Sequence, residues 1–106
     1  MTPDWSLVEI ENGIKQERVF ALYLYTPMCG TCQLAGKMLS IVEKTMPQMS
    51  FARSDLNFIP QLAEEYSVES VPCLLLFKNN ELQDKLYAFH SVPFLYEQLL
   101  KLDGSK

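Results

Sequence analysis

The sequence predicts an α/β fold, in which a mixed sheet of four or five strands is flanked by helices. The run Val19 to Tyr25 is apolar throughout, which is typical of a central strand covered on both faces. Helical and strand patterns alternate through most of the chain. The last two strand patterns are separated only by Asn79-Asn80, which predicts a hairpin. Crossovers followed by a hairpin give a sheet with parallel and antiparallel neighbours.

The first half of the chain contains two helix–strand pairs. Asp4 to Ile14 has helical periodicity, which weakens at its Asn-Gly pair, and Arg18 to Tyr25 is the first strand. Gln33 to Met46 is the second helix, and Pro47 ends it. Met49 to Asp55 is the second strand. We therefore expect a crossover connection here, with a helix between two strands of one sheet.

The second half begins with a helix that Asn57 can cap. Cys73 to Lys78 and Glu81 to Ala88 are the hairpin strands, and Ser91 caps a final helix. The residues expected to face inward from the four helices are Leu7, Ile10 and Ile14; Leu34, Met38, Ile41 and Val42; Ile59, Leu62, Ala63 and Tyr66; and Leu95, Leu99 and Leu102. Phe20, Phe51, Phe58, Phe77 and Phe89 are expected to pack on the two sheet faces.

Size and composition restrict the class of protein. The 106 residues are 48% hydrophobic and carry a net charge of −4, so one packed domain spanning residues 1–106 is expected. The charges are scattered, which argues against nucleic-acid binding. No apolar stretch reaches the roughly 18 residues that cross a bilayer. The start, Met1 to Trp5, has no positive region and no long apolar segment, so a cytoplasmic location is expected.

The most informative motif is Cys29-Gly30-Thr31-Cys32, which lies where the first strand ends and the second helix begins. Two thiols at this spacing can close a disulfide and reopen it, which suits exchange with other disulfides. The alternatives are half of a zinc site or two inert buried thiols. A structural zinc site usually requires four nitrogen or sulfur ligands, which favours the redox interpretation.

The element order, this motif, and the segment Ser70 to Asn79 with its Val71-Pro72 pair resemble the thioredoxin family over nearly the whole chain. The resemblance implies a thioredoxin fold and a protein-disulfide reductase. It implies that Cys29 is the nucleophile, with a pKa lowered at a helix N-terminus, and that Cys32 resolves the mixed disulfide. It further implies a cis Pro72 lying against the two cysteines.

The resemblance also implies a binding site for substrate. It places Met28, Gly30, Thr31, Val71 and Pro72 around the nucleophile, with the backbone of Val71 free to pair with an extended peptide. Ala88 and Phe89 align with a segment that borders the family's substrate groove.

Four positions depart from the family. Met28 replaces a Trp, and Thr31 replaces a Pro, so the Thr31 hydroxyl and N–H can stabilise the Cys29 thiolate and make the couple less reducing. Tyr23 replaces a buried Asp that accepts the proton of the second thiol, and a phenol is a poor base. Water or another carboxylate must then take the proton, or resolution is slow. Arg53, which aligns with a lysine near that acid, is expected to be solvated.

Cys73 is the fourth departure. A buried apolar filler is the favoured interpretation, because cysteine is among the most often buried residues. The alternative is a reactive or metal-binding third thiol close to Cys29, which with His90 could complete a Cys₃His set for zinc. An exposed loop position is favoured for His90.

Three functions remain open from the sequence. The first is a reductase of protein disulfides; the second is an enzyme of the same mechanism that serves one partner; the third is a non-catalytic module that binds a protein or a metal. Neither a cofactor nor a resident metal is expected. The resemblance implies a flavin-dependent thioredoxin reductase as the electron donor, with a low-molecular-weight thiol as the alternative. A monomer is expected, with no nucleic-acid or membrane partner.

Overall fold

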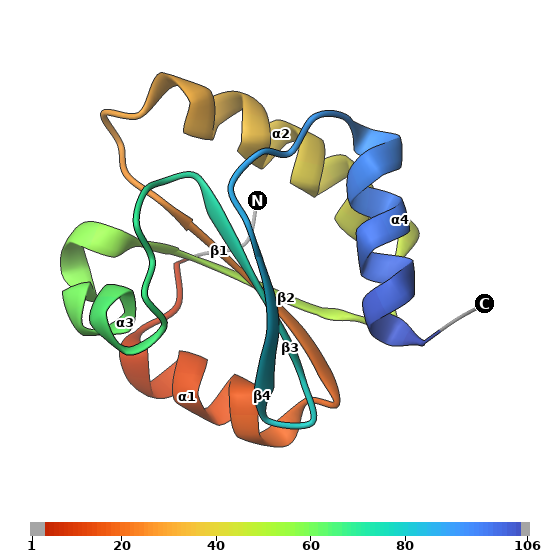
Figure 1. Cartoon of the computed structure of the whole chain (residues 1–106), viewed down its shortest axis with the longest axis horizontal. Helices are drawn as coiled ribbons and strands as arrows, with labels where there is room; N and C mark the ends of the chain where they lie inside the picture. Colours follow the sequence, from red (N-terminus) through yellow and green to blue (C-terminus); the bar gives the residue numbers. More distant parts are fainter. Residues whose placement is uncertain (1–3, 105–106) are drawn as a thin grey trace.

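Helices cover both faces of a four-stranded mixed sheet in a computed structural model that describes residues 4–104, so Met1 to Pro3 of the N-terminal stretch lie outside it. Figure 1 shows α1 and α3 on one side of the sheet, and α2 and α4 on the other. The elements are α1 (Leu7–Gln16), β1 (Val19–Tyr25), α2 (Gly30–Thr45), β2 (Ser50–Asp55), the 3₁₀ helix η1 (Leu56–Phe58), α3 (Pro60–Glu65), β3 (Cys73–Lys78), β4 (Glu81–Leu86) and α4 (Val92–Asp103).

The strand order β2-β1-β3-β4 confirms the predicted combination of a crossover and a hairpin. β1 runs parallel to β2 and antiparallel to β3, and β3 is antiparallel to β4. Asn79 and Asn80 have φ angles of 52° and 71°, as the predicted hairpin turn requires. The register places Tyr23 of β1 beside Arg53 of β2, on the same face of the sheet.

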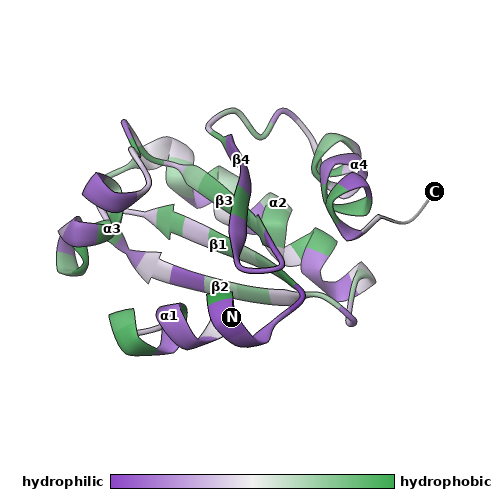
Figure 2. Cartoon of the chain, turned by 60° about the horizontal axis from the view of Figure 1, so that its bottom comes forward, coloured by the Kyte–Doolittle hydropathy of each residue, from purple (hydrophilic) through white to green (hydrophobic). Residues whose placement is uncertain are grey.

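β1 is the central strand that its apolar sequence predicts, because Val19 to Leu24 are all buried. Its side chains alternate between two cores: Ala21 and Tyr23 face the core under α2 and α4, whereas Phe20, Leu22 and Leu24 face the core under α1 and α3. Figure 2 shows the contrast between the green, hydrophobic β3 and the largely purple β4 at the sheet edge. None of the helices within residues 4–104 has the length and hydropathy needed to traverse a bilayer.

α1 begins and ends later than predicted. Ser6 and Glu9 form a capping box, which satisfies the first amide groups and sets the start at Leu7. Gly13 lies inside the helix instead of ending it. A Cβ at Gly13 would come within 2.9 Å of the Trp5 ring and 3.1 Å of the Phe20 ring, so the missing side chain lets Trp5 stack on Phe20.

The predicted inward face of α2 is partly wrong. Leu34 and Ile41 are more than half exposed, whereas Val42 is buried as predicted and Met38 packs at the edge of the core. The helix begins at Gly30, and its true inward positions are Cys32, Ala35, Leu39 and Val42. This spacing gives one face of a helix, but its first positions are small and carry little hydrophobic signal.

Three further predictions are wrong in detail. Asp55, not Asn57, provides the cap: its carboxylate accepts from the Asn57 N–H at 2.9 Å and starts η1 ahead of α3. Phe58 is 81% exposed because η1 points it away from both cores. β4 ends at Leu86, two residues early. The α4 prediction is confirmed, with a Ser91 cap and Leu95, Leu99 and Leu102 buried.

Candidate functional site

Cys29 and Cys32 form a disulfide where β1 passes into α2. Cys29 is the N-cap of α2, and its sulfur accepts from the Cys32 N–H at 3.1 Å. Cys29 is partly exposed, whereas Cys32 is only 3% exposed. The pair therefore presents one sulfur to a reactant and shields the other.

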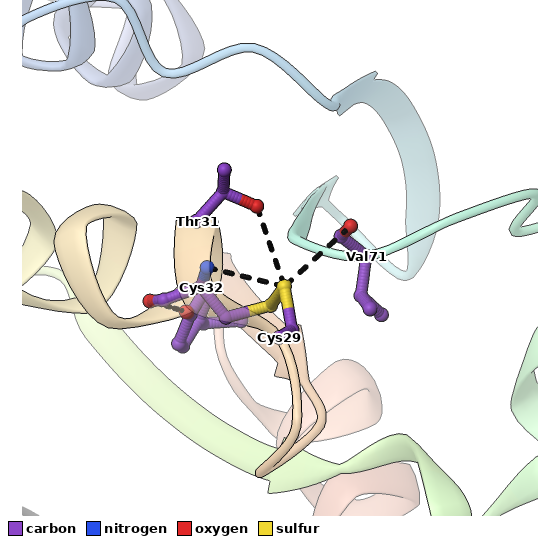
Figure 3. The surroundings of a disulfide bond; sticks show 5 residues. Cys29, Thr31, Cys32 and Val71 are labelled. Atoms are coloured by element: carbon purple, nitrogen blue, oxygen red, sulfur yellow. Dashed lines mark hydrogen bonds between the residues drawn. A yellow bond between two sulfur atoms is a disulfide. The ribbon is translucent and has the colours of Figure 1, made fainter.

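The Cys29 sulfur lies between a hydroxyl and a carbonyl group (Figure 3). Thr31 Oγ1 is 3.4 Å away and Val71 O is 3.9 Å away. A disulfide sulfur carries no hydrogen, so only the Thr31 hydroxyl can donate in this state. On reduction, the hydroxyl, the Cys32 N–H and the helix N-terminus all favour a negative charge on Cys29. This environment suits a reactive thiolate.

The Val71–Pro72 peptide bond is cis, as the resemblance implies. A groove of about 330 Å³ separates this loop from the first turns of α2, and its lining includes Thr31, Leu34, Pro72 and Phe89. Met28 is 95% exposed, and a Cβ at Gly30 would meet nothing within 4 Å. The structure thus places Thr31 and Val71 beside the Cys29 sulfur, puts Pro72 on the lining of the groove, and leaves Met28 and Gly30 exposed.

Tyr23 lies beneath the resolving position. Its side chain is 2% exposed, and its hydroxyl donates a short hydrogen bond to the Cys32 carbonyl oxygen. Burial raises the Tyr23 pKa to about 12. Tyr23 is therefore a hydrogen-bond donor to the backbone of α2 and not a proton acceptor near neutral pH, which agrees with the sequence prediction.

The prediction of a solvated Arg53 is wrong. Its side chain is 17% exposed, with the guanidinium 4.5 Å from the centre of the Tyr25 ring. Arg53 Nε also lies 3.4 Å from Asp4 Oδ1 in an ion pair. Asp4 Oδ2 in turn accepts from the Tyr25 hydroxyl at 2.6 Å and from the Asp55 N–H at 3.1 Å.

Sequence reasoning missed this network, because Asp4 lies far from its partners along the chain. The N-terminal segment reaches them by running beside β2: the Trp5 N–H donates to Arg53 O at 2.9 Å, and the Ser54 hydroxyl donates to Trp5 O at 2.9 Å. No periodicity or motif in the sequence signals such a contact.

Cys73 and His90 take the favoured roles. Cys73 is fully buried in the core under α1 and α3, and burial raises its pKa to about 11. His90 is exposed, with its ring edge-on to Phe94 at 4.7 Å. Among residues 4–104, no group of three or more His, Cys, Asp or Glu side chains is placed to hold a metal ion.

Comparison with known proteins identifies the family. The thioredoxin family model matches residues 7–96. The chain is 48% identical over 99 residues to the thioredoxin-like protein YusE of Bacillus subtilis, covering 93% of each protein. The same fold occurs in thioredoxin from Trypanosoma brucei brucei, with a TM-score of 0.86 and 13% identity; the match covers 99% of this chain and 93% of that one. A mutant thioredoxin from Halobacterium salinarum has the same fold, with a TM-score of 0.84 and 20% identity; the match covers 93% of this chain and 87% of that one.

The structural likenesses establish the fold, and the family model and the Bacillus relative establish the kinship. Thioredoxins exchange thiols and disulfides through a Cys-x-x-Cys pair, and this chain has formed that disulfide between Cys29 and Cys32. The protein is a thiol–disulfide oxidoreductase and belongs to the thioredoxin family.

Proposed function

We propose that the chain, as one domain over residues 1–106, reduces protein disulfides with Cys29 as the nucleophile and Cys32 as the resolving thiol. The observation that carries this proposal is the asymmetry of the pair. Cys29 is accessible at a helix N-terminus beside the Thr31 hydroxyl, whereas Cys32 is buried one turn later. The accessible sulfur is the one that a large substrate can reach.

The reaction runs in two exchanges. The Cys29 thiolate attacks one sulfur of the substrate disulfide, which breaks that bond, forms a mixed disulfide and releases the first substrate thiolate. Cys32 then loses its proton and attacks the Cys29 sulfur. The Cys29–Cys32 bond forms, and the second substrate thiolate leaves and takes a proton from solvent. The substrate gains two electrons and the enzyme becomes the disulfide.

The substrate would bind across the groove beside Pro72. An extended peptide can pair with the Val71 backbone, whose carbonyl already lies 3.9 Å from the Cys29 sulfur. Thr31 and Pro72 line the groove, and we assign Met28 and Gly30, which are exposed, to its border. Met28 offers a flexible apolar contact, which suits partners of varied shape.

The family acts on disulfide substrates together with reductases, and we assign this chain the same cycle. A flavin-dependent thioredoxin reductase is the proposed electron donor, and a low-molecular-weight thiol is the alternative. The proposed setting is the cytoplasm, where a monomer would support electron transport and redox homeostasis. The scattered charges and the net charge of −4 give no reason to add a nucleic-acid or membrane partner.

Insulin reduction by dithiothreitol tests the proposal. The wild-type protein should accelerate it, and Cys29→Ser should abolish the acceleration. Cys73→Ala is the matched control, because Cys73 is buried away from the groove and should be dispensable. Cys32→Ser should accumulate the mixed disulfide. A folded, oxidised wild-type protein that leaves insulin untouched would indicate a single dedicated partner. Stoichiometric zinc without a disulfide would indicate a non-catalytic module.

A further inference from the structure

Residues 66–72 form the loop that connects α3 to β3 and that ends at the cis proline. At its start, the Val68 N–H donates to Ala63 O at 2.9 Å. The Ser67 N–H donates to Glu64 O at 3.4 Å, so α3 ends in a Schellman motif, in which Ser67 has the left-handed φ of 53°. Glycine is the usual residue at this position, because a side chain makes left-handed backbone unfavourable. A turn built on serine therefore depends more on contacts from elsewhere in the fold.

Two side chains at the end of β4 supply such contacts. Lys85 Nζ donates to Tyr66 O at 3.0 Å and to Ser67 O at 2.9 Å. The Tyr87 hydroxyl accepts from the Glu69 N–H at 3.2 Å and donates to Ser67 O at 3.5 Å. The last carbonyl groups of a helix have no partner within it, so an ammonium group at that end satisfies them and interacts favourably with the helix dipole. Lys85 and Tyr87 thus stabilise the first part of the loop from β4.

The other end of the same loop lies at the reactive disulfide. Val71 O is 3.9 Å from the Cys29 sulfur, as Figure 3 shows. Pro72 and Tyr87 both line the groove of about 330 Å³ beside it. Tyr87 therefore contributes to the groove with its side chain and holds, through its hydroxyl, the loop that ends there. Val71 lies between this contact and Cys73, where the loop enters the β3 ladder.

We propose that Lys85 and Tyr87 are positioning residues for substrate binding, which hold residues 66–69 so that the Val71 backbone stays in place to pair with an extended peptide. The proposal rests on the proposed function, in which Cys29 attacks protein disulfides. A loop that is fixed before binding loses little conformational freedom when the substrate arrives, so the pairing is stronger. The substrate class that benefits is a disulfide with an extended backbone next to its cysteine. Small disulfides without a backbone should not benefit, because Cys29 lies on another element.

The test compares two disulfides that release the same coloured thiolate, 2-nitro-5-thiobenzoate, when the reduced protein attacks them. The first is an extended peptide whose one cysteine is joined to this group. The second is 5,5′-dithiobis(2-nitrobenzoate), which has no peptide backbone. Stopped-flow measurements over a range of peptide concentrations give the concentration for half-saturation and the limiting rate. For the small disulfide they give the rate constant of the concentration-dependent phase.

Lys85→Met and Tyr87→Phe remove the polar contacts and keep most of the side-chain volume. Each should raise the peptide concentration for half-saturation by about threefold or more, the factor by which one hydrogen bond shifts an equilibrium. The limiting rate and the rate constant for the small disulfide should not change. Lys85→Arg keeps donors for both carbonyl groups and should restore most of the wild-type value. Tyr87→Phe alone decides the matter if Lys85→Met does not fold.

Matched controls come from α4. Lys101→Met removes an exposed lysine and Tyr96→Phe removes an exposed phenol hydroxyl, so they repeat the two chemical changes away from the loop and should match the wild type. A further control is the peptide with every amide of its extended segment N-methylated, which cannot donate to Val71 O. With this peptide, the wild type, Lys85→Met and Tyr87→Phe should react alike.

Amide hydrogen exchange measures the order of the loop directly. In Lys85→Met, the Glu69 N–H keeps the Tyr87 hydroxyl as its acceptor. Its exchange should nevertheless become about threefold faster or more, because local opening of the whole loop sets that rate. Unchanged exchange at Glu69 would show that Lys85 does not hold the loop, and would overturn its assigned role.

The inference is overturned if Lys85→Met and Tyr87→Phe bind the peptide like Lys101→Met and Tyr96→Phe. It is also overturned if they slow the reaction with the small disulfide as much as the reaction with the peptide, which would indicate a general loss of structure. Failure of the proposed function looks different. In that case the wild type leaves the peptide disulfide intact, or Cys29→Ser cleaves it as fast, and the inference is overturned together with the function on which it rests.

Discussion

Thr31 should tune the redox potential of the pair, and Thr31→Val isolates its hydroxyl. Valine keeps the branched shape and the backbone N–H, and loses only the Oγ1 that lies 3.4 Å from the Cys29 sulfur. A hydrogen bond to a charged group contributes about 1.5–3 kcal/mol, and the length of this contact places it at or below the lower end, at about 1 kcal/mol. The Cys29 pKa should therefore rise by about 0.7 units.

The sign of the change in redox potential depends on whether the hydroxyl stabilises the reduced or the oxidised form. The hydroxyl stabilises the thiolate of the reduced form, so its removal disfavours reduction and makes the potential more negative. For a two-electron couple, about 1 kcal/mol corresponds to about 20 mV. The full shift is expected at a pH above the Cys29 pKa of both proteins, and it should fade at lower pH, where both are protonated.

Equilibration against glutathione buffers across pH measures the potential, and the pH dependence of iodoacetamide alkylation measures the Cys29 pKa. Thr31→Ser retains the hydroxyl and should stay close to the wild type. Thr31→Pro also removes the N–H and should be at least as reducing as Thr31→Val. An unchanged potential in Thr31→Val and Thr31→Pro, or a shift towards a more oxidising couple, would refute this account of Thr31.

Three other changes test the packing around the site. Gly36→Ala should raise the free energy of unfolding in urea by about 0.5–1 kcal/mol, because Gly36 lies inside α2 and the new Cβ would be 3.5 Å from the Tyr23 hydroxyl, an ordinary contact; a loss of stability would show that this space is needed. Tyr23→Phe should cost about 1 kcal/mol yet leave the pH profile of resolution below pH 10 unchanged, because a phenol with a pKa of about 12 does not titrate there; an altered profile would contradict this role. The pKa of Cys73 is raised from 9.0 to about 11, so the contribution of this thiol to stability is complete below pH 9 and is lost as pH rises towards 11. Cys73→Ala should therefore flatten the fall in unfolding free energy between pH 9 and pH 11. An equally steep fall in the variant would show that Cys73 does not cause it.

Strong local signals made most of the fold predictable. A continuous apolar run, an Asn-Asn turn and a Ser cap each specify backbone geometry within a few residues, and β1, the hairpin and α4 formed as expected. The start of α1 was predictable in principle, because Ser6 and Glu9 have the spacing of a capping box. The inward face of α2 was not, since its first positions are small and larger apolar residues indicated another face.

The residues of the candidate site also include some that the sequence predicts and some that it does not. The cysteine pair and the Val71-Pro72 loop are short motifs, and the resemblance to the thioredoxin family that they carry implied that the two lie close together. Arg53 and Asp4 belong to no motif. Their contact depends on how the N-terminal segment lies against β2, and that placement arises only from tertiary packing. Long-range ion pairs of this kind leave no periodic trace in a single sequence.

Two departures from the family bear on the redox potential of the pair. Thr31 adds a donor to Cys29. Tyr23 does not oppose it, because a protonated phenol brings no negative charge, whereas an ionised aspartate at that position would disfavour the thiolate. Stabilising the thiolate favours the reduced form. We therefore expect a couple that is less reducing than in family members with Gly-Pro between the cysteines.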